Sequence, residues 1–304
     1  MSIILVTGSR GFIGNRLTRF LLEQGFDVKE FDIKISREMD ITSLTNVEKI
    51  FRRIRPEVVV HLAANANTSL AYRDPYFDFS INVLGTLNIL NASKNIGVKH
   101  LIFASSAYVY GKPKYLPINE EHPLEPVNPY GLSKLVGEKY IEMYRKLFAL
   151  EFTIFRFFNI YGPGQIRGFV IPDFIERALS VVKKSENIFL VKSSPNAARD
   201  FIYVDDAIQA IVTVIEKGPV GEAFNICSGR PIRIIDIART ILNLLGASNV
   251  AIKCEGTDKA KPDVIYGSFE KAKKVIGWQP KTSFEEGIKA TINYYCKVKD
   301  GSFK

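Results

Sequence analysis

A serine, a tyrosine and a lysine occur in this sequence in an order and spacing that suit proton transfer. Ser106 ends an apolar run, and Tyr130 and Lys134 take positions i and i+4 of a predicted helix, on one face. A free phenol has a pKa of about 10, too high for a base at neutral pH, but a neighbouring cation lowers it. The serine hydroxyl can hold the same substrate oxygen. These residues predict a proton-transfer site beside a hydride acceptor; an exposed helix pair is the alternative.

A glycine-rich segment, TGSRGFIG at 7–14, follows the first apolar run. Gly8, Gly11 and Gly14 lie where a predicted strand turns into a helix, and such a turn needs positive φ and a bare backbone beside a pyrophosphate. The GxxGxxG spacing is a variant of the dinucleotide-binding fingerprint. Asp32 ends the next predicted strand, where a carboxylate can accept both ribose hydroxyls of an adenosine. The segment predicts a dinucleotide site, in preference to an ordinary glycine-rich turn.

The elements that must position these residues alternate along the first half of the chain. Predicted strands span 3–6, 28–32, 58–62, 101–104 and 152–157. Predicted amphipathic helices span 12–23, 44–54, 81–95 and 130–148. This alternation is typical of an α/β fold with a doubly wound parallel sheet. After about residue 165 the elements become shorter and alternate less regularly, which indicates a second, smaller domain.

The composition excludes several classes of protein. With 304 residues, 46% of them hydrophobic and 24% charged, the chain is neither disordered nor fibrous. No apolar run approaches the roughly 18 residues of a membrane-spanning helix, so we expect neither a membrane segment nor a signal peptide. The three cysteines and three histidines are scattered, so we expect no disulfide framework and no metal site, and a cytoplasmic location is favoured.

The net charge of +9 invites a nucleic-acid interpretation, because phosphate neutralisation dominates such binding. The basic residues are, however, dispersed along the chain, and no zinc-finger spacing, heptad zipper or aromatic-rich RNA-binding strand accompanies them. A positive surplus equally suits a small anionic ligand such as a nucleotide diphosphate. We therefore expect a small-molecule substrate and no nucleic acid.

Together these motifs resemble the extended short-chain dehydrogenase/reductase family, in particular its nucleotide-sugar epimerases and dehydratases. The resemblance covers nearly the whole chain. The matching stretches are TGSRGFIG at 7–14, HLAA at 61–64, NVLGT at 82–86, SSAYVYG at 105–111, PYGLSK at 129–134, RFFNIYGP at 156–163, RDFIYVDD at 199–206, FNI at 224–226 and GWQP at 277–280. The resemblance implies a Rossmann fold with a smaller α/β substrate domain.

The resemblance also implies roles for individual residues. Ser106, Tyr130 and Lys134 correspond to a catalytic triad. The residues expected around an NAD cofactor are Gly8, Arg10, Gly11, Phe12, Ile13, Asp32, Asp40, Ile41, Leu62, Ala63, Ala64, Asn82, Tyr130 and Lys134. The residues expected to contact a nucleotide-sugar are Ser106, Tyr130, Asn159 and Arg199, with Val170, Ile171, Pro172 and Phe174 around the base.

An arginine fork at Arg199 suits phosphate oxygens, although a salt bridge to Asp200 or Asp205 is the alternative. The resemblance further implies a dinucleotide-binding domain at 1–165 to which 199–227 returns, and a substrate domain at 166–198 and 228–304.

Three departures from the family's pattern bear on the substrate. The stretch from Asp32 to Asp40 is short, as in nucleotide-sugar 4-keto reductases. The glycine-rich turn before the Arg199 motif is replaced by SSPNAA at 193–198, and a late arginine is missing, with Lys259 and Lys261 nearby.

The expected activity is NAD-dependent epimerisation of a nucleotide-sugar at C4 through a 4-keto intermediate, most simply between UDP-glucose and UDP-galactose. The related 4,6-dehydratases carry an Asp-Glu pair where this chain has Ala107 and Tyr108, and we expect Glu120 and Glu121 to be solvated. A 4-keto reductase, a 4,6-dehydratase and a non-catalytic NAD(P)-binding sensor protein are the alternatives.

The sequence also bears on the choice of cofactor and on the oligomeric state. The charge of Asp32 repels a 2′-phosphate and favours NAD, whereas Arg10 and Lys34 favour NADP. The resemblance implies a homodimer, for which the apolar stripes of 81–95 and 130–148 offer a four-helix interface. Burial of both stripes against their own sheet is the alternative.

Overall fold

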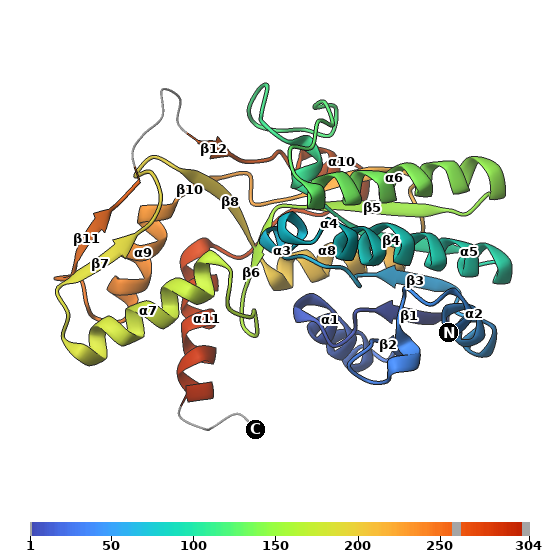
Figure 1. The fold of residues 1–304 in the computed structure, drawn as a ribbon, viewed down its shortest axis with the longest axis horizontal. Coiled ribbons are helices and arrows are strands. Elements are labelled where there is room, and N and C mark those ends of the chain that lie inside the picture. Colours follow the sequence, from blue (N-terminus) through green and yellow to red (C-terminus); the bar gives the residue numbers. More distant parts are fainter. Residues whose placement is uncertain (1, 257–262, 300–304) are drawn as a thin grey trace.

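The structure, a computed structural model, describes residues 2–256 and 263–299. A larger lobe is built around a six-stranded sheet, and a smaller lobe lies at its side (Figure 1). The sequence analysis predicted this α/β architecture, and the described residues confirm it.

The six-stranded sheet is parallel throughout, in the order β2-β1-β3-β4-β5-β9. Its strands are β1 (Ile3–Thr7), β2 (Asp27–Phe31), β3 (Val58–His61), β4 (His100–Ser106), β5 (Phe152–Phe157) and β9 (Ala223–Ile226). All residues of β3 and β5 are buried, because helices cover both faces of the sheet.

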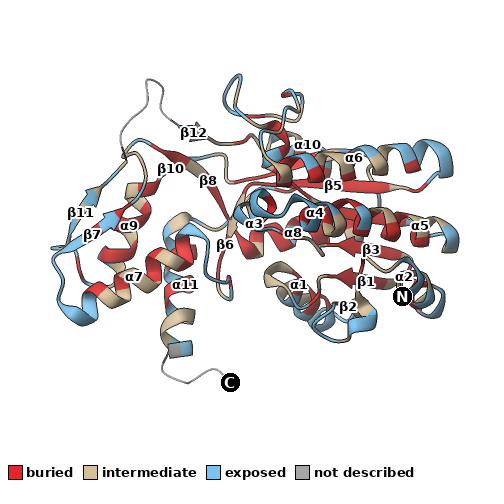
Figure 2. Ribbon diagram, in the orientation of Figure 1, coloured by how far each residue is buried: buried red, intermediate tan, exposed pale blue. Residues whose placement is uncertain are grey.

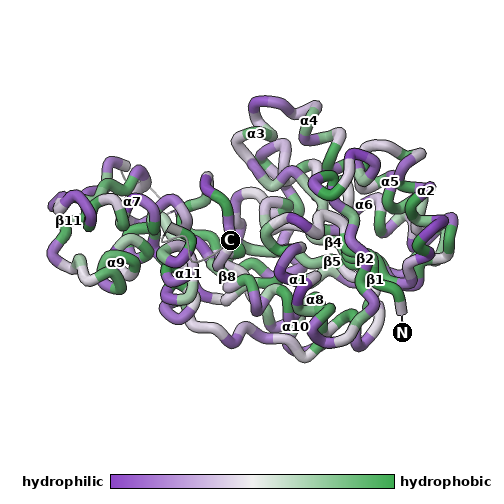
Figure 3. The backbone as a smooth tube through the Cα atoms, turned by 90° about the horizontal axis from the view of Figure 1, so that it is seen from below, coloured by the Kyte–Doolittle hydropathy of each residue, from purple (hydrophilic) through white to green (hydrophobic). Residues whose placement is uncertain are grey.

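Along each strand, successive side chains point to opposite faces of the sheet. Ile4 and Val6 pack with α1 (Phe12–Glu23) and α8 (Val204–Lys217) on one face. Leu5 lies on the other face in a separate cluster. The helices of that second cluster are α2 (Leu44–Ile54), α5 (Thr86–Ile96) and α6 (Pro129–Phe148). Figure 2 shows the buried residues concentrated on these strands, and hydrophobic stretches gather at β1 in Figure 3.

The strand order reverses between β1 and β3, and this is where open α/β sheets bind ligands. The two loops leaving these strands touch. Gly8 has a φ of +68°, and a Cβ added to it would lie 2.7 Å from the amide nitrogen of Ala63. Only glycine fits both the left-handed conformation and this close approach.

The helix expected at 81–95 is interrupted. A short helix α4 (Pro75–Phe79) leads into a π-helical turn, Ser80–Gly85, and only then does α5 begin. A Cβ on Gly85 would lie 2.6 Å from Cδ1 of Ile41, so the turn brings its backbone against that side chain. Single π-helical turns of this kind occur frequently at functional sites.

The smaller lobe contains mixed short elements. A four-stranded sheet is formed by β6 (Asn159–Tyr161), β8 (Ala198–Tyr203), β10 (Pro231–Arg233) and β12 (Val264–Ile265), and β7 (Ile188–Val191) pairs with β11 (Ala251–Cys254). Its helices are α7 (Val170–Lys184), α9 (Ile234–Leu244) and α11 (Phe284–Lys299). The short helices α3 (Thr68–Arg73) and α10 (Glu270–Ile276) complete the described chain.

One boundary differs from the expected return of 199–227 to the first domain. β8 pairs with β6, β10 and β12 in the second sheet, whereas α8 and β9 belong with the six-stranded sheet. The division into two domains otherwise stays a prediction. Within residues 2–256 and 263–299, no helix combines the length and the apolar character needed to traverse a bilayer.

Candidate active site

The structure brings Ser106, Tyr130 and Lys134 together. Ser106 is the last residue of β4, and α6 begins just before Tyr130, where Asn128 caps the helix by accepting a hydrogen bond from the amide of Gly131 at 2.7 Å. The Ser106 hydroxyl acts on the phenol and favours its ionised form. The Lys134 ammonium donates to the Ala104 carbonyl at 2.8 Å and lies 5.0 Å from the centroid of the Phe103 ring.

Burial controls the protonation of this group, since all three side chains are less than a tenth exposed. It raises the pKa of Tyr130 to about 12, against the opposing effect of the Ser106 hydrogen bond. It lowers the pKa of Lys134 to about 8. A phenolate at this position therefore requires positive charge beside it, in addition to a protonated Lys134.

The glycine-rich loop fits a dinucleotide pyrophosphate. A Cβ on Gly14 would fall on the carbonyl oxygen of Gly8, so the loop closes tightly against the start of α1. Gly11 caps α1 without a side-chain hydrogen bond, and the Ser9 hydroxyl is buried with no protein partner. The first amides of α1, at Phe12 and Ile13, lack intrahelical acceptors, and a helix N-terminus favours an anion.

Asp32 lies beside this loop in a fixed orientation. Its two carboxylate oxygens accept the backbone amides of Arg10 and Lys34, each at 2.8 Å. Each oxygen keeps a second lone pair, which fits the ribose hydroxyls of an adenosine. The Arg10 guanidinium pairs with Glu30 at the surface, with two contacts of 2.8 Å, while the fixed charge of Asp32 repels a 2′-phosphate. This arrangement favours NAD over NADP.

The other residues expected around the cofactor follow the same edge of the sheet. Asp40 accepts hydrogen bonds from the amide and hydroxyl of Thr42 at 2.8 Å, and Ile41 packs on Gly85. Leu62, Ala63 and Ala64 leave β3 beside Gly8.

A directed chain of hydrogen bonds connects the ends of β1 and β3, where the strand order reverses, with the π-helical turn. The sequence analysis did not predict it. The amide of Ala63 donates to Thr7 at 3.2 Å, and the Thr7 hydroxyl reaches Nδ1 of His61 at 2.7 Å. Nε2 of His61 reaches Thr86 at 3.1 Å, whose hydroxyl donates to the Asn82 carbonyl at 2.6 Å. Burial lowers the pKa of His61 to about 3, so the ring is neutral and uses one nitrogen as donor and one as acceptor.

A buried ion pair stands behind the triad. The Arg156 guanidinium of β5 donates to both carboxylate oxygens of Glu138, to Oε2 at 2.7 Å and to Oε1 at 3.1 Å. The carboxylate also accepts the hydroxyl of Ser105, the residue before Ser106. Glu138 lies one helical turn after Lys134, and this spacing together with an arginine inside an apolar strand is the signal that could have revealed the pair.

The expectation that Glu120 is solvated is wrong. Its Oε1 accepts the amide of Asn225 at 2.7 Å, and burial raises the pKa of its carboxyl group. Tyr110 connects this region to the ion pair, because its hydroxyl donates to Asn225 at 2.7 Å and accepts from Arg156 at 3.0 Å. Glu121 is exposed, as expected.

On the expected substrate side, Arg199 already has partners. Its guanidinium donates to the carboxylate and the carbonyl of Asp263, at 2.6 and 2.7 Å. The alternative pairing with Asp200 or Asp205 is wrong, because Asp200 holds the amides of the 228–229 turn and Asp205 pairs with Arg16. Lys259 and Lys261 lie outside the described residues.

The structure does not bring together Asn159, expected at the diphosphate, and the four residues expected around the nucleotide base. Asn159 donates to the Asp200 carbonyl at 2.8 Å at the edge of the second sheet. Val170 and Phe174 line a cavity of about 640 Å³ at the N-terminal end of α7, together with Arg167 and Arg177. Ile171 and Pro172 are buried, and Ile171 belongs to the core cluster of the lobe, so the structure does not bring them to the cavity.

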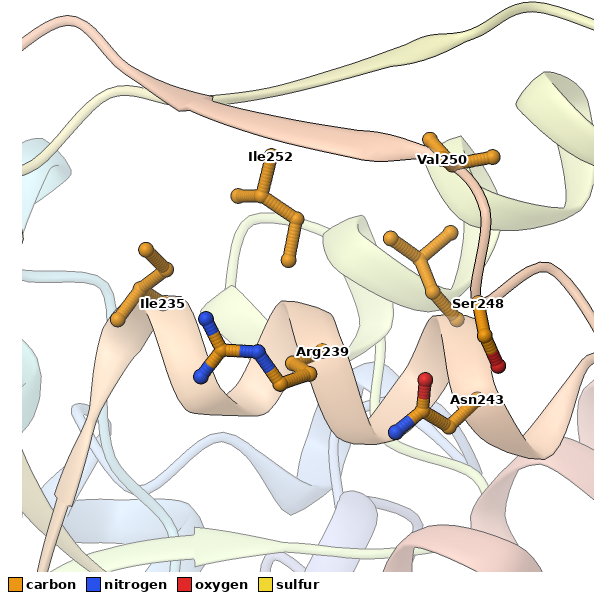
Figure 4. A pocket seen from close by; sticks show the side chains of 7 residues that line it. Ile235, Arg239, Asn243, Ser248, Val250 and Ile252 are labelled. Atoms are coloured by element: carbon orange, nitrogen blue, oxygen red, sulfur yellow. The ribbon is translucent and has the colours of Figure 1, made fainter.

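A second cavity, of about 250 Å³, lies between α9 and β11 (Figure 4). It is lined by Ile235, Arg239, Leu242, Asn243, Ser248, Val250 and Ile252, none of which is a predicted site residue.

Among the described residues, no cluster of histidine, cysteine and acidic side chains could hold a metal ion.

Comparison with known proteins agrees with this geometry. The model of the NAD dependent epimerase/dehydratase family matches residues 4–227. A UDP-glucuronate 4-epimerase of Thermodesulfobacterium geofontis is 31% identical, over 97% of this chain and 96% of that protein. The UDP-glucose 4-epimerase of Thermotoga maritima, solved with UDP-glucose, is 33% identical with a TM-score of 0.88, over 98% of this chain and 99% of its own. The Thermus thermophilus UDP-glucose 4-epimerase, solved with NAD, is 29% identical with a TM-score of 0.84, over 97% and 99%.

The chain belongs to the NAD-dependent epimerase/dehydratase family, whose members act on nucleotide-sugars as 4-epimerases and 4,6-dehydratases. NAD is the cofactor of this family.

The position of Asp32 predicts its effect on cofactor binding. Asp32→Ala should weaken NAD binding about tenfold to a hundredfold, because a hydrogen bond to a charged group contributes roughly 1.5–3 kcal/mol. Calorimetric titration of purified protein with NAD and NADP measures this effect. Asp27→Ala on the same strand, where the carboxylate pairs with exposed Lys29, should bind NAD normally. Tighter binding of NADP than NAD by the unmodified protein would contradict the assignment.

The buried ion pair predicts a large loss of stability when one partner is removed. Arg156→Met should lower the free energy of unfolding by about 3–5 kcal/mol, because it leaves the Glu138 carboxylate buried without a counter-charge. Urea denaturation measures this change. The matched control is Arg52→Met, which removes an exposed partner of Glu48 and should cost less than about 1 kcal/mol. Equal effects of the two substitutions would show that Arg156 does not compensate a buried charge.

Proposed function

We propose that this chain catalyses the NAD-dependent epimerisation of a nucleotide-sugar at C4 through a 4-keto intermediate. The simplest substrate pair is UDP-galactose and UDP-glucose. The observation that carries the proposal is the buried group of Ser106, Tyr130 and Lys134 at the carboxyl ends of the strands, on the same edge of the sheet as the glycine-rich loop. The likeness to UDP-sugar 4-epimerases supports the choice of reaction.

Bound NAD would supply an acceptor for the hydride of C4, and return of that hydride to the opposite face of the 4-keto sugar would invert C4 without net oxidation. In this proposal the loop from Gly8 to Gly14 and the start of α1 hold its pyrophosphate, and Asp32 holds its adenosine ribose. The contact between Gly8 and Ala63 fixes the floor of this cleft.

The chain's own residues carry the proton. Tyr130 Oη takes the proton of the C4 hydroxyl as C4 becomes a carbonyl, and it returns that proton when C4 is reduced. Ser106 holds the same sugar oxygen through its hydroxyl. In this proposal the Lys134 ammonium, one helical turn after Tyr130 on α6, stabilises the phenolate, because nearby positive charge favours the ionised phenol.

Dehydration is disfavoured by the residues after Ser106. Ala107 has no group that transfers protons, and the ring of Tyr108 packs edge-on against Tyr130 at 5.7 Å. Glu120 is engaged by the amide of Asn225, and Glu121 is exposed. Neither the two positions after Ser106 nor Glu120 and Glu121 therefore offer a carboxyl pair for the elimination of water across C5 and C6.

A 4-keto reductase is the second candidate, because of the short stretch between Asp32 and Asp40. It would consume a reduced cofactor stoichiometrically, whereas an epimerase recycles its own. The carboxylate of Asp32, which repels a 2′-phosphate, weighs against an NADP-dependent reductase. A non-catalytic sensor protein has no need of a buried phenol beside a buried ammonium.

Tyr130→Phe should reduce turnover of UDP-galactose by at least about a hundredfold, because general acid–base catalysis contributes roughly that factor or more. Folding and NAD binding should stay unchanged. Tyr108→Phe, which keeps the ring packed on Tyr130, should retain most of the activity. Near-normal turnover by Tyr130→Phe would rule out the mechanism.

A panel of UDP-, dTDP- and GDP-sugars, UDP-glucuronate included, tests the reaction class. Conversion of UDP-galactose to UDP-glucose without net NADH formation supports the proposal. Accumulation of a 4-keto-6-deoxy sugar from any of them would identify a dehydratase.

We also propose a homodimer through α4, the 80–85 turn and α6. These segments expose large apolar side chains: Phe79 is 56% exposed, Leu84 40%, Met143 40% and Leu147 64%. Contiguous exposed apolar patches mark interaction sites, and the proposal takes these side chains to form such a patch.

Sedimentation at micromolar concentration should give twice the mass of one chain. Leu147→Asp should shift the protein towards monomer, while Leu22→Asp, at an equally exposed site on α1, should not. A monomeric unmodified protein would refute the proposal.

A further inference from the structure

We propose that Asp78 is a positioning residue of the candidate active site, which orients Asn82 and supplies the buried negative charge that balances the Lys134 ammonium. The inference deepens the proposed function and rests on it. Nothing in the motifs pointed to this residue, because it lies between the matching stretches of the sequence.

Asp78 is buried at the end of α4, just before the π-helical turn, with 1% of its surface exposed. Its Oδ1 accepts hydrogen bonds from the side-chain amides of Asn82 and Asn65, both at 2.9 Å. Asn82 Oδ1 in turn accepts the amide of Asn65 at 2.8 Å. The Asn82 amide also lies 3.2 Å from the Ser133 hydroxyl, on α6 next to Lys134. Asp78 is thereby connected to the helix that carries Tyr130 and Lys134.

The charges around Lys134 leave Asp78 as its counter-ion. Glu138 faces it from the same helix, but both oxygens of that carboxylate are taken by Arg156 of β5. His61 of β3 is neutral, and β4 offers only the Ala104 carbonyl and the Phe103 ring. Tyr130, on its own helix, is protonated at neutral pH. Among the described residues that face Lys134, Asp78 is the one carboxylate without a cationic partner of its own.

The electrostatics agree with this pairing. Burial lowers the pKa of Lys134, and Asp78 opposes that change more strongly than Glu138 does. Asp78 also helps to raise the pKa of Tyr130. An asparagine at this position would accept the same two hydrogen bonds without the cost of burying a charge. The hydrogen bonds therefore do not account for a carboxylate at this position, whereas a buried ammonium does.

Asp78→Asn tests the charge while keeping the shape and the acceptor. The pKa of Lys134 should fall by about one pH unit, because an opposite charge that favoured the ammonium is lost. NMR of the protein labelled with ¹³C-lysine measures it without turnover, and Lys134→Arg identifies the resonance. Asp74→Asn is the control: Asp74 caps α4 by accepting the amide of Phe77 at 2.9 Å, and asparagine caps equally well.

In Asp78→Asn, the whole pH profile of kcat/KM should also shift to lower pH. Loss of the negative charge lets Tyr130 ionise at lower pH, which moves the acidic limb down. Lys134 then loses its proton at lower pH as well, which moves the alkaline limb in the same direction. Asp78→Glu should restore both limbs towards their original positions.

An unchanged pKa of Lys134 in Asp78→Asn would overturn the inference, even if activity or stability fell. A lowered pKa in a protein that turns over no nucleotide-sugar would uphold Asp78 as the counter-ion and refute the proposed function instead. If Asp78→Asn does not fold, Asp78→Ser removes the same charge with less volume and carries the same expectation.

Discussion

The burial of the Lys134 ammonium is the constraint on which the rest of the site depends. Water cannot solvate this charge, so the protein must replace it: β4 supplies a carbonyl and an aromatic face, and in our inference α4 supplies the carboxylate of Asp78. Its helix also carries Tyr130, and the Ser106 hydroxyl faces that phenol from the end of β4. Stabilising the ammonium therefore also fixes the group that moves the proton.

The parallel sheet explains why the two halves of the site meet. All six strands point the same way, so Gly8, Ala63 and Ser106 leave the sheet at one edge. The hydrogen-bond chain from Ala63 through His61 to Asn82 ties this edge to the π-helical turn. A continuous α-helix through 81–95 would carry Asn82 in a different register, because a π turn adds a residue to the helical repeat.

Local patterns predicted the strands and helices of the first half closely, since alternation of apolar runs and amphipathic helices depends on neighbours in sequence. Contacts between distant residues were not predictable in the same way. The pairing of Arg156 with Glu138, the engagement of Glu120 by Asn225 and the choice of Asp263 as the partner of Arg199 each depend on tertiary packing. Asp78 was missed for the same reason: its burial depends on the tertiary packing of α4 and not on the residues next to it in the sequence.

The ion pairs on the two sides of the site differ in the free energy that it costs to separate them. Behind the triad, Arg156 and Glu138 are almost fully buried, and separating them costs several kcal/mol. Arg199 pairs with Asp263 where that carboxylate is 58% exposed, and exchanging such a partner for another anion costs little. In the proposed function a diphosphate would replace Asp263 on this guanidinium. The chemistry would then be fixed by the parallel sheet, and the choice of substrate by the smaller lobe, which carries α7 and its cavity.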